Sequence, residues 1–136
     1  MNDENMKDLA RIRFERAIEL ADEADKLLNE KHFKSANNRA FYSAEKAIKA
    51  ALAAKGKDSE THNGVIRTFN MEFIRVPCKF FDREDMSIVQ SMERIRTASD
   101  YDDFYVTSKT ECEEQVKKAR DLLNKVQNYL TSEKII

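Results

Sequence analysis

Residues 33–55 read FKSANNRAFYSAEKAIKAALAAK, and this stretch carries the strongest fold signal in the chain. Apolar side chains recur at the three- and four-residue spacing of one helix face, and most are alanine: Phe33, Ala36, Ala40, Phe41, Ala44, Ala47, Ile48, Ala51 and Leu52. Small side chains let neighbouring helices approach closely, and Gly56 is a suitable stop just past the end. The stretch therefore predicts a closely packed helix within a helical protein.

Four other segments show the same periodicity, at about residues 6–30, 61–76, 85–98 and 108–130, the last opening with the capping-box pattern Ser-Lys-Thr-Glu. Two glycines and one proline leave little turn chemistry for a protein of many strands. A length of 136 residues is typical of one domain. We therefore expect an all-α fold, an up-and-down bundle of four to five helices, forming a single domain over residues 1–136.

Charge is balanced in total but not along the chain. The 24 basic and 25 acidic residues give a net charge of −1. Residues 31–57 hold seven Lys or Arg against Glu45, whereas residues 99–115 hold six acids against Lys109. This asymmetry fits either two partners of opposite charge or two surfaces that pair in a homodimer. Together with the alanine-lined helix, it leads us to expect a two-fold dimer.

Several classes of site and location have little support in the sequence. Cys78 and Cys112 are far apart and form no zinc pattern, and we expect Cys112 to be buried on the last helix. His32 and His62 have no ligand neighbours and are expected to be exposed or to cap helices. Phosphate-loop, dinucleotide and metalloprotease motifs are absent, so we expect no cofactor and no metal.

Without a signal-peptide core or a membrane-length apolar run, a reduced cytoplasm is expected.

Residues 94–105, Arg-Ile-Arg-Thr-Ala-Ser-Asp-Tyr-Asp-Asp-Phe-Tyr, are the strongest functional signal. Arg94 and Arg96 are expected to close the helix over residues 85–98, and their forked donors suit phosphate groups. Tyr101 offers a hydroxyl that can act as an acid, a base, a ligand or an acceptor of modification. The alternative is an irregular loop whose aromatic residues anchor it to the core.

A second polar group, Asn37-Asn38-Arg39 followed by Phe41 and Tyr42, lies within the alanine-rich helix. Asparagine is unfavourable inside a helix, so two in succession suggest side chains that bind something specific. Asn38, Arg39 and Tyr42 are therefore candidate contacts to a nucleotide or RNA. Alternatively, one asparagine satisfies a buried polar group of the bundle.

Three segments in order, residues 38–44, 62–73 and 94–103, resemble the HEPN domain. The likeness is closest to small bacterial and archaeal HEPN proteins encoded beside a minimal nucleotidyltransferase, and it covers about residues 8–131. It implies an all-α bundle that dimerises, with a motif of the family at the cleft between subunits. In ribonuclease members that motif is an arginine, four to six residues, then a histidine. In some toxin–antitoxin pairs the nucleotidyltransferase adenylylates a tyrosine two residues past that histidine.

The sequence departs from this pattern at the histidine. Counting from Arg94, Ser99 takes the histidine position and Tyr101 the acceptor position. Counting from Arg96, Tyr101 itself takes the histidine position. The resemblance thus implies Arg94, Arg96 and Asp100 as catalytic candidates, with Asp100 as a substitute base, and Tyr101 as modification acceptor. Whether the chain is an enzyme, a metal-independent ribonuclease, stays open.

Three functions remain. The first, which we favour, is a HEPN toxin-like subunit that pairs with a minimal nucleotidyltransferase antitoxin, has RNA as its target class and is silenced by adenylylation of Tyr101. The second is a divergent ribonuclease in which Asp100 is the base. The third is a non-catalytic nucleotide-binding or scaffold module.

Overall fold

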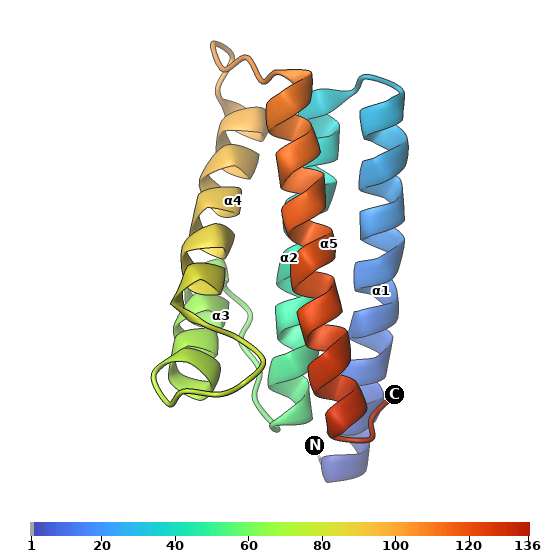
Figure 1. Ribbon diagram of the computed structural model, residues 1–136, viewed down its shortest axis with the longest axis vertical. Coiled ribbons are helices and arrows are strands. Elements are labelled where there is room, and N and C mark those ends of the chain that lie inside the picture. The colour runs from blue at the N-terminus through green and yellow to red at the C-terminus, as the bar shows by residue number, and fades with distance from the viewer. Residues whose placement is uncertain (1) are drawn as a thin grey trace.

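A computed structural model describes residues 2–136, which fold into five α-helices and one π-helical turn. The elements are α1 (Asp3–Asn29), α2 (Phe33–Ala54), α3 (His62–Phe69), η1 (Asn70–Ile74), α4 (Arg83–Tyr101) and α5 (Lys109–Ser132). No strand occurs in these residues. The long helices α1, α2, α4 and α5 alternate in direction, and α3 packs beside α4 (Figure 1). The predicted all-α, up-and-down bundle is confirmed.

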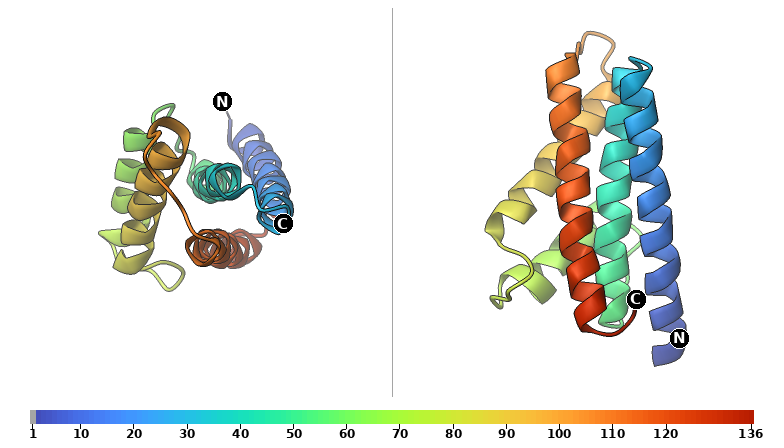
Figure 2. Two further views of the ribbon diagram at one scale, coloured as in Figure 1. Left: turned by 90° about the horizontal axis from the view of Figure 1, so that it is seen from above. Right: turned by 45° about the vertical axis from the view of Figure 1, so that its right-hand side comes forward.

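Helix α2 is the centre of the bundle. It lies between α1 and α4, with α5 along a third side (Figure 2). The alanines of its apolar stripe are fully buried, among them Ala36, Ala40, Ala44 and Ala47. Side chains this small let the other helices approach its backbone closely. The stripe is therefore buried within one chain, and it gives no support to a dimer.

Aromatic side chains close the end of the core where α3, η1 and the C-terminal half of α5 meet. The Phe73 ring lies 5.1 Å from that of Phe81 and 5.0 Å from that of Tyr129, both nearly edge-on. Phe80 adds a further edge-on contact with Tyr129 at 5.4 Å. Burial, reinforced by the neighbouring Glu133 carboxylate, raises the pKa of the Tyr129 hydroxyl above its ordinary value. This cluster anchors the shorter helices to α5.

The π-helical turn η1 gives Phe73 its place in that cluster. The Arg75 N–H donates to the Asn70 carbonyl, five residues back, at 2.8 Å. A turn of this width contains one residue more than an α-helical turn. Phe73 is 1 % exposed within it, so the extra residue coincides with an inward-facing aromatic side chain.

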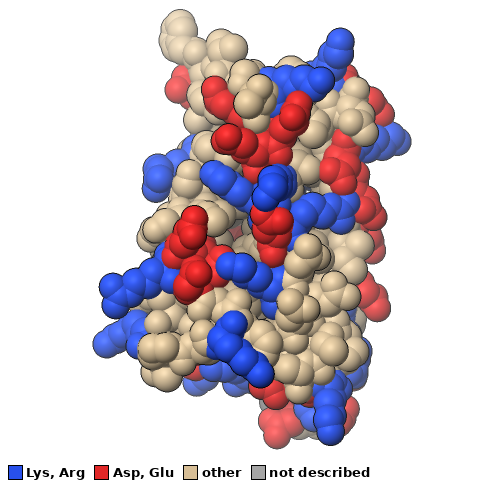
Figure 3. Space-filling model, in the orientation of Figure 1, with Lys and Arg blue, Asp and Glu red and all other residues tan. Residues whose placement is uncertain are grey.

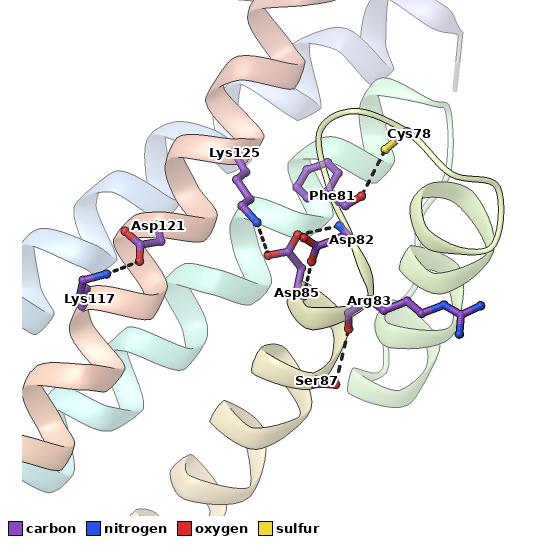
Figure 4. A network of polar contacts seen from close by, with 9 residues as sticks. All are labelled: Cys78, Phe81, Asp82, Arg83, Asp85, Ser87, Lys117, Asp121 and Lys125. Atoms are coloured by element: carbon purple, nitrogen blue, oxygen red, sulfur yellow. Dashed lines mark hydrogen bonds and ion pairs between the residues drawn. The ribbon is translucent and has the colours of Figure 1, made fainter.

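The start of α4 is fixed by two aspartates and a lysine (Figure 4). Asp82 accepts a hydrogen bond from the Asp85 N–H at 3.1 Å, and Asp85 accepts one from the Asp82 N–H at 2.9 Å. The Lys125 ammonium of α5 donates to the other Asp85 oxygen at 2.7 Å. Burial opposes the charge of Lys125, but Asp85 outweighs it and raises the lysine pKa. A buried carboxylate thus caps α4 and joins it to α5.

The start of α5 is as expected only in part. Ser108 accepts from the Glu111 N–H at 3.1 Å, as the capping pattern predicts. The Glu111 carboxylate, however, accepts a hydrogen bond from the Tyr105 hydroxyl at 3.4 Å, whereas a full capping box would have it accept from the Ser108 N–H. Cys112, on the first turn, is fully buried as predicted, and burial raises the pKa of its thiol to about 11.

Within residues 2–136, none of the helices combines the length and apolar character needed to cross a membrane.

Replacing Asp85 with alanine should lower the free energy of unfolding by about 2 kcal/mol, because the cap is lost and Lys125 loses its partner. Urea titration followed by helical circular dichroism measures this. Asp121→Ala is the matched control, because its partner Lys117 and Asp121 itself are exposed on α5. The control should leave the urea midpoint unchanged, and equal effects of the two substitutions would contradict the role given to Asp85.

Candidate functional site

Helix α4 continues beyond the point at which the sequence placed its end. It runs to Tyr101, and the Asp102 N–H still donates to the Ala98 carbonyl at 3.0 Å. The expectation that Arg94 and Arg96 close the helix was therefore wrong. Residues 94–101 are helical, and the irregular segment begins only at residue 102. Because successive residues of a helix point in different directions around its axis, the side chains of the motif lie on different sides of α4.

Arg96 faces inward, against α2. It is 6 % exposed, and its guanidinium carbon lies 5.3 Å from the Phe41 ring centroid and 5.5 Å from that of Tyr42. A guanidinium at these distances is attracted by the negative faces of aromatic rings. Its NH1 also lies 3.5 Å from a carboxylate oxygen of Asp100, one turn later. Arg96 thus holds α4 to α2.

Ser99, at the histidine position counted from Arg94, is held by hydrogen bonds inside the protein. It is buried, and its hydroxyl donates to the Ile95 carbonyl at 2.7 Å. The Asn37 amide of α2 donates to the Ser99 oxygen at 3.2 Å and to the Thr107 hydroxyl oxygen at 3.4 Å. Asn37 therefore satisfies buried polar groups, as one of the two interpretations of the asparagine pair predicted.

The second asparagine joins a chain of polar contacts that crosses the molecule from α1 to α4. The side-chain amide nitrogen of Asn38 donates to the Asp100 carboxylate at 2.9 Å. The Arg39 guanidinium donates to the side-chain oxygen of Asn38 at 2.6 Å. Arg39 also lies 3.3 Å from the Glu23 carboxylate of α1. Asp100 in turn pairs with Arg96. The structure therefore brings four predicted site residues, Asn38, Arg39, Arg96 and Asp100, into one network.

Arg94 and Tyr101 lie on the other, exposed side of α4. They are seven positions apart, which is two helical turns, so they lie above one another on the same side. Both line a shallow pocket together with Glu93, Thr97, Ala98 and Asp102. Tyr101 is 75 % exposed. The pocket thus presents a guanidinium and a phenol on one side of α4, two turns apart, and it does not include Arg96.

The loop after α4 adds exposed apolar side chains near this pocket. Phe104 is 95 % exposed and Val106 is 84 % exposed. They belong to the loop that projects at the end of the bundle, at the top of Figure 1. Two large apolar side chains beside an exposed tyrosine are typical of a contact surface.

His62 has a partner that the sequence did not predict. Its Nδ1 is hydrogen-bonded to the Glu45 carboxylate of α2, and its ring packs against Phe41 at 5.5 Å between centroids. Thr61, not His62, caps α3, by accepting from the Gly64 N–H at 3.0 Å. We expected His62 to be exposed or capping, and neither description fits a half-buried, paired imidazole. Its partner is 17 positions away on another helix, so no local spacing could reveal it.

Known proteins resemble this chain in sequence. The sequence pattern of the HEPN domain matches residues 10–129. A protein of Methanocaldococcus jannaschii named "Putative toxin MJ0142" is 30 % identical over 122 residues, covering 90 % of this chain and 82 % of that protein. A UPF0332 protein of Thermotoga maritima is 28 % identical over 115 residues, covering 85 % of this chain and 86 % of that protein.

A solved structure has the same fold. The crystal structure of TT1696 from Thermus thermophilus superposes with a TM-score of 0.72 at 19 % identity, covering 88 % of this chain and 96 % of that one. At this level of identity the likeness concerns the fold. The domain match over residues 10–129 shows that the chain belongs to the HEPN domain family.

Proposed function

We propose that this chain is a HEPN toxin-like subunit that pairs with a minimal nucleotidyltransferase antitoxin, and that RNA is its target class. Its family and the toxin name carried by its archaeal relative support the first part. The observation that carries the proposal is that Arg94 and exposed Tyr101 line the same pocket.

In the proposed silencing step, the Tyr101 hydroxyl attacks the α-phosphorus of ATP held by the nucleotidyltransferase. The bond from this phosphorus to the oxygen bridging to the β-phosphate breaks, pyrophosphate leaves, and the phenol proton passes to solvent. The product is a phosphodiester between Tyr101 and AMP, in the pocket that Arg94 also lines. A guanidinium there can pair with the new phosphate, so Arg94 would no longer be free to hold RNA.

One observation favours a second candidate, a non-catalytic nucleotide-binding or scaffold module. Ser99 replaces the histidine of the family motif and cannot serve as a base near neutral pH. Asp100, the substitute base, already accepts from Asn38 and pairs with Arg96. A domain that has lost its proton acceptor can still hold a phosphate through Arg94.

We also propose that the protein is a dimer through the end of the bundle at which Tyr101, Phe104 and Val106 are exposed. Burying Phe104 and Val106 against a two-fold copy would remove them from water. A cleft between the two copies would then contain both Arg94–Tyr101 pairs.

Co-expression with the neighbouring nucleotidyltransferase should increase the intact mass of the protein by one AMP unit. Tyr101→Phe should abolish the increase, because phenylalanine lacks the attacking oxygen. Tyr105→Phe is the matched control, since this nearby tyrosine is half-buried and its hydroxyl binds Glu111. An unmodified wild-type protein, alongside a nucleotidyltransferase that labels another HEPN substrate, would rule out Tyr101 as acceptor.

Unmodified protein should cleave single-stranded RNA in the presence of EDTA, and Arg94→Ala should slow the reaction by at least about 100-fold by removing phosphate stabilisation. Gel analysis of a labelled RNA measures both rates, with the exposed Arg75→Ala as control. Cleavage that persists in the Arg94→Ala protein would point to a contaminating nuclease. RNA that binds but stays intact would favour the non-catalytic module.

Light scattering should give a molar mass twice that of one chain. The double substitution Phe104→Ser and Val106→Ser should return it to that of a monomer, whereas Val76→Ser, at an exposed apolar residue elsewhere, should not. A wild-type mass equal to one chain at all concentrations would exclude the dimer.

A further inference from the structure

We propose that the open side of α2 binds the phosphodiester backbone of single-stranded RNA. This surface, the α2 trough, consists of Lys34, Asn38, Arg39, Tyr42 and Lys46 with Arg16 of α1. The inference rests on the proposed function and deepens it, because it names where the RNA lies on the subunit.

The trough exists because α2 is covered on all sides but one. Helices α1 and α4 flank it and α5 packs behind it, while no helix of residues 2–136 lies across the remaining side (Figure 2). The α2 residues of the trough recur at three- and four-residue intervals, which keeps them on one face. They are only partly buried, in contrast to the alanines on the other faces.

Two depressions in this surface are adjacent. One is lined by Lys34, Ser99, Asp100 and Tyr101, together with Ser35. The other is lined by Arg16, Leu20, Tyr42 and Lys46. Both include Asn38 and Arg39, so they share a wall on α2. The combined trough therefore leads from Tyr101 across α2 to α1.

The lining of the trough is rich in cations. Four cationic side chains line the two depressions together with the Asp100 carboxylate, and two of the four, Arg16 and Arg39, pair with Glu19 and Glu23 of α1. Asp100 is already held by Asn38 and Arg96. Within residues 2–136 no carboxylate forms an ion pair with Lys34 or Lys46. Two positive charges in the trough are thus available to a ligand.

Lys46 shows how closely the cations gather. Burial lowers its pKa, and the nearby charges of Lys49 and Arg13 lower it further, against the opposing effect of Glu45. A phosphate bound here would relieve repulsion among like charges. By contrast, the face in Figure 3 mixes acidic and basic side chains.

The lining favours a nucleic acid over a protein partner. Leu20 is the one aliphatic residue among those that line the two depressions, whereas the centre of a protein interface is usually apolar. The Tyr42 ring can stack with a base, and the Asn38 amide lies beside it. A groove of cations with an aromatic ring and no apolar centre is typical of binding to single strands.

Tyr101 connects this surface to the proposed silencing step. It lines both the α2 trough, beside Asp100, and the outer pocket with Arg94. AMP on its hydroxyl would place a negative phosphate at one end of the trough and repel an RNA strand. Adenylylation would therefore weaken RNA binding as well as occupy Arg94.

The test measures fluorescence anisotropy of a labelled 2′-O-methyl oligouridine of about 12 nucleotides, which resists cleavage and matches the size of single-strand sites. The double variant Lys34→Gln and Lys46→Gln removes the two unpaired cations. Each lost phosphate contact lowers the salt slope by about 0.7, so affinity at 0.1 M salt should fall by about 25-fold. The matched control is Lys109→Gln and Lys117→Gln, which removes two exposed cations from α5.

Supporting results are a weaker affinity and shallower salt slope in the trough variant alone, and weaker binding by adenylylated wild-type protein than by unmodified protein. Equal affinities of trough variant and control, or no binding by the wild type, would overturn the proposal. If the trough variant instead loses the nucleotidyltransferase and keeps the RNA, the surface is a protein docking site. Labelling of Tyr101 is measured separately, so its failure would not be mistaken for failure of the trough.

Discussion

The close packing of α2 is the constraint on which the rest of the molecule depends. A helix with neighbours on three sides can be accommodated only if the side chains between the backbones are small, and Ala36, Ala40, Ala44 and Ala47 meet this condition without any exposed surface. Larger residues there would push α1, α4 or α5 outward at a cost of about 1–3 kcal/mol each. The polar residues of α2 can reach both α1 and α4 because those helices are held so near.

That constraint sorts the residues of α4 into two groups with different roles. Arg96, Ser99 and Asp100 face α2 and are engaged by its aromatic and amide side chains. Arg94 and Tyr101 face outward and have no comparable attachment to α2. The family motif is thus divided between a structural half and an accessible half. Ser99, which takes the histidine position when the motif is counted from Arg94, belongs to the structural half, where its hydrogen bonds give it a structural role.

The sequence predicted what depends on local periodicity and little of what depends on contacts between helices. The helices, the buried Cys112 and the cap at Ser108 follow from spacing alone. The end of α4 did not, because its last turn is held against α2 by the contacts of Ser99 and Asp100 with Asn37 and Asn38. The pairing of His62 with Glu45 could not be predicted either, because it also joins residues of two different helices. Candidate site residues could be selected by type, but only the fold shows which of them face one another.

The π-helical turn has a consequence for chain length in this part of the molecule. Because η1 contains one residue more than an α-helical turn, loss of a single residue there would restore ordinary α-helical hydrogen bonding. The wide turn takes up its extra residue locally, so the residues on either side of such a deletion would keep their directions about the helix axis. A deletion that spared Phe73 would leave it facing Phe81 and Tyr129, which it contacts edge-on. This turn is thus a place where the chain could lose one residue and keep the aromatic cluster that joins the short helices to α5.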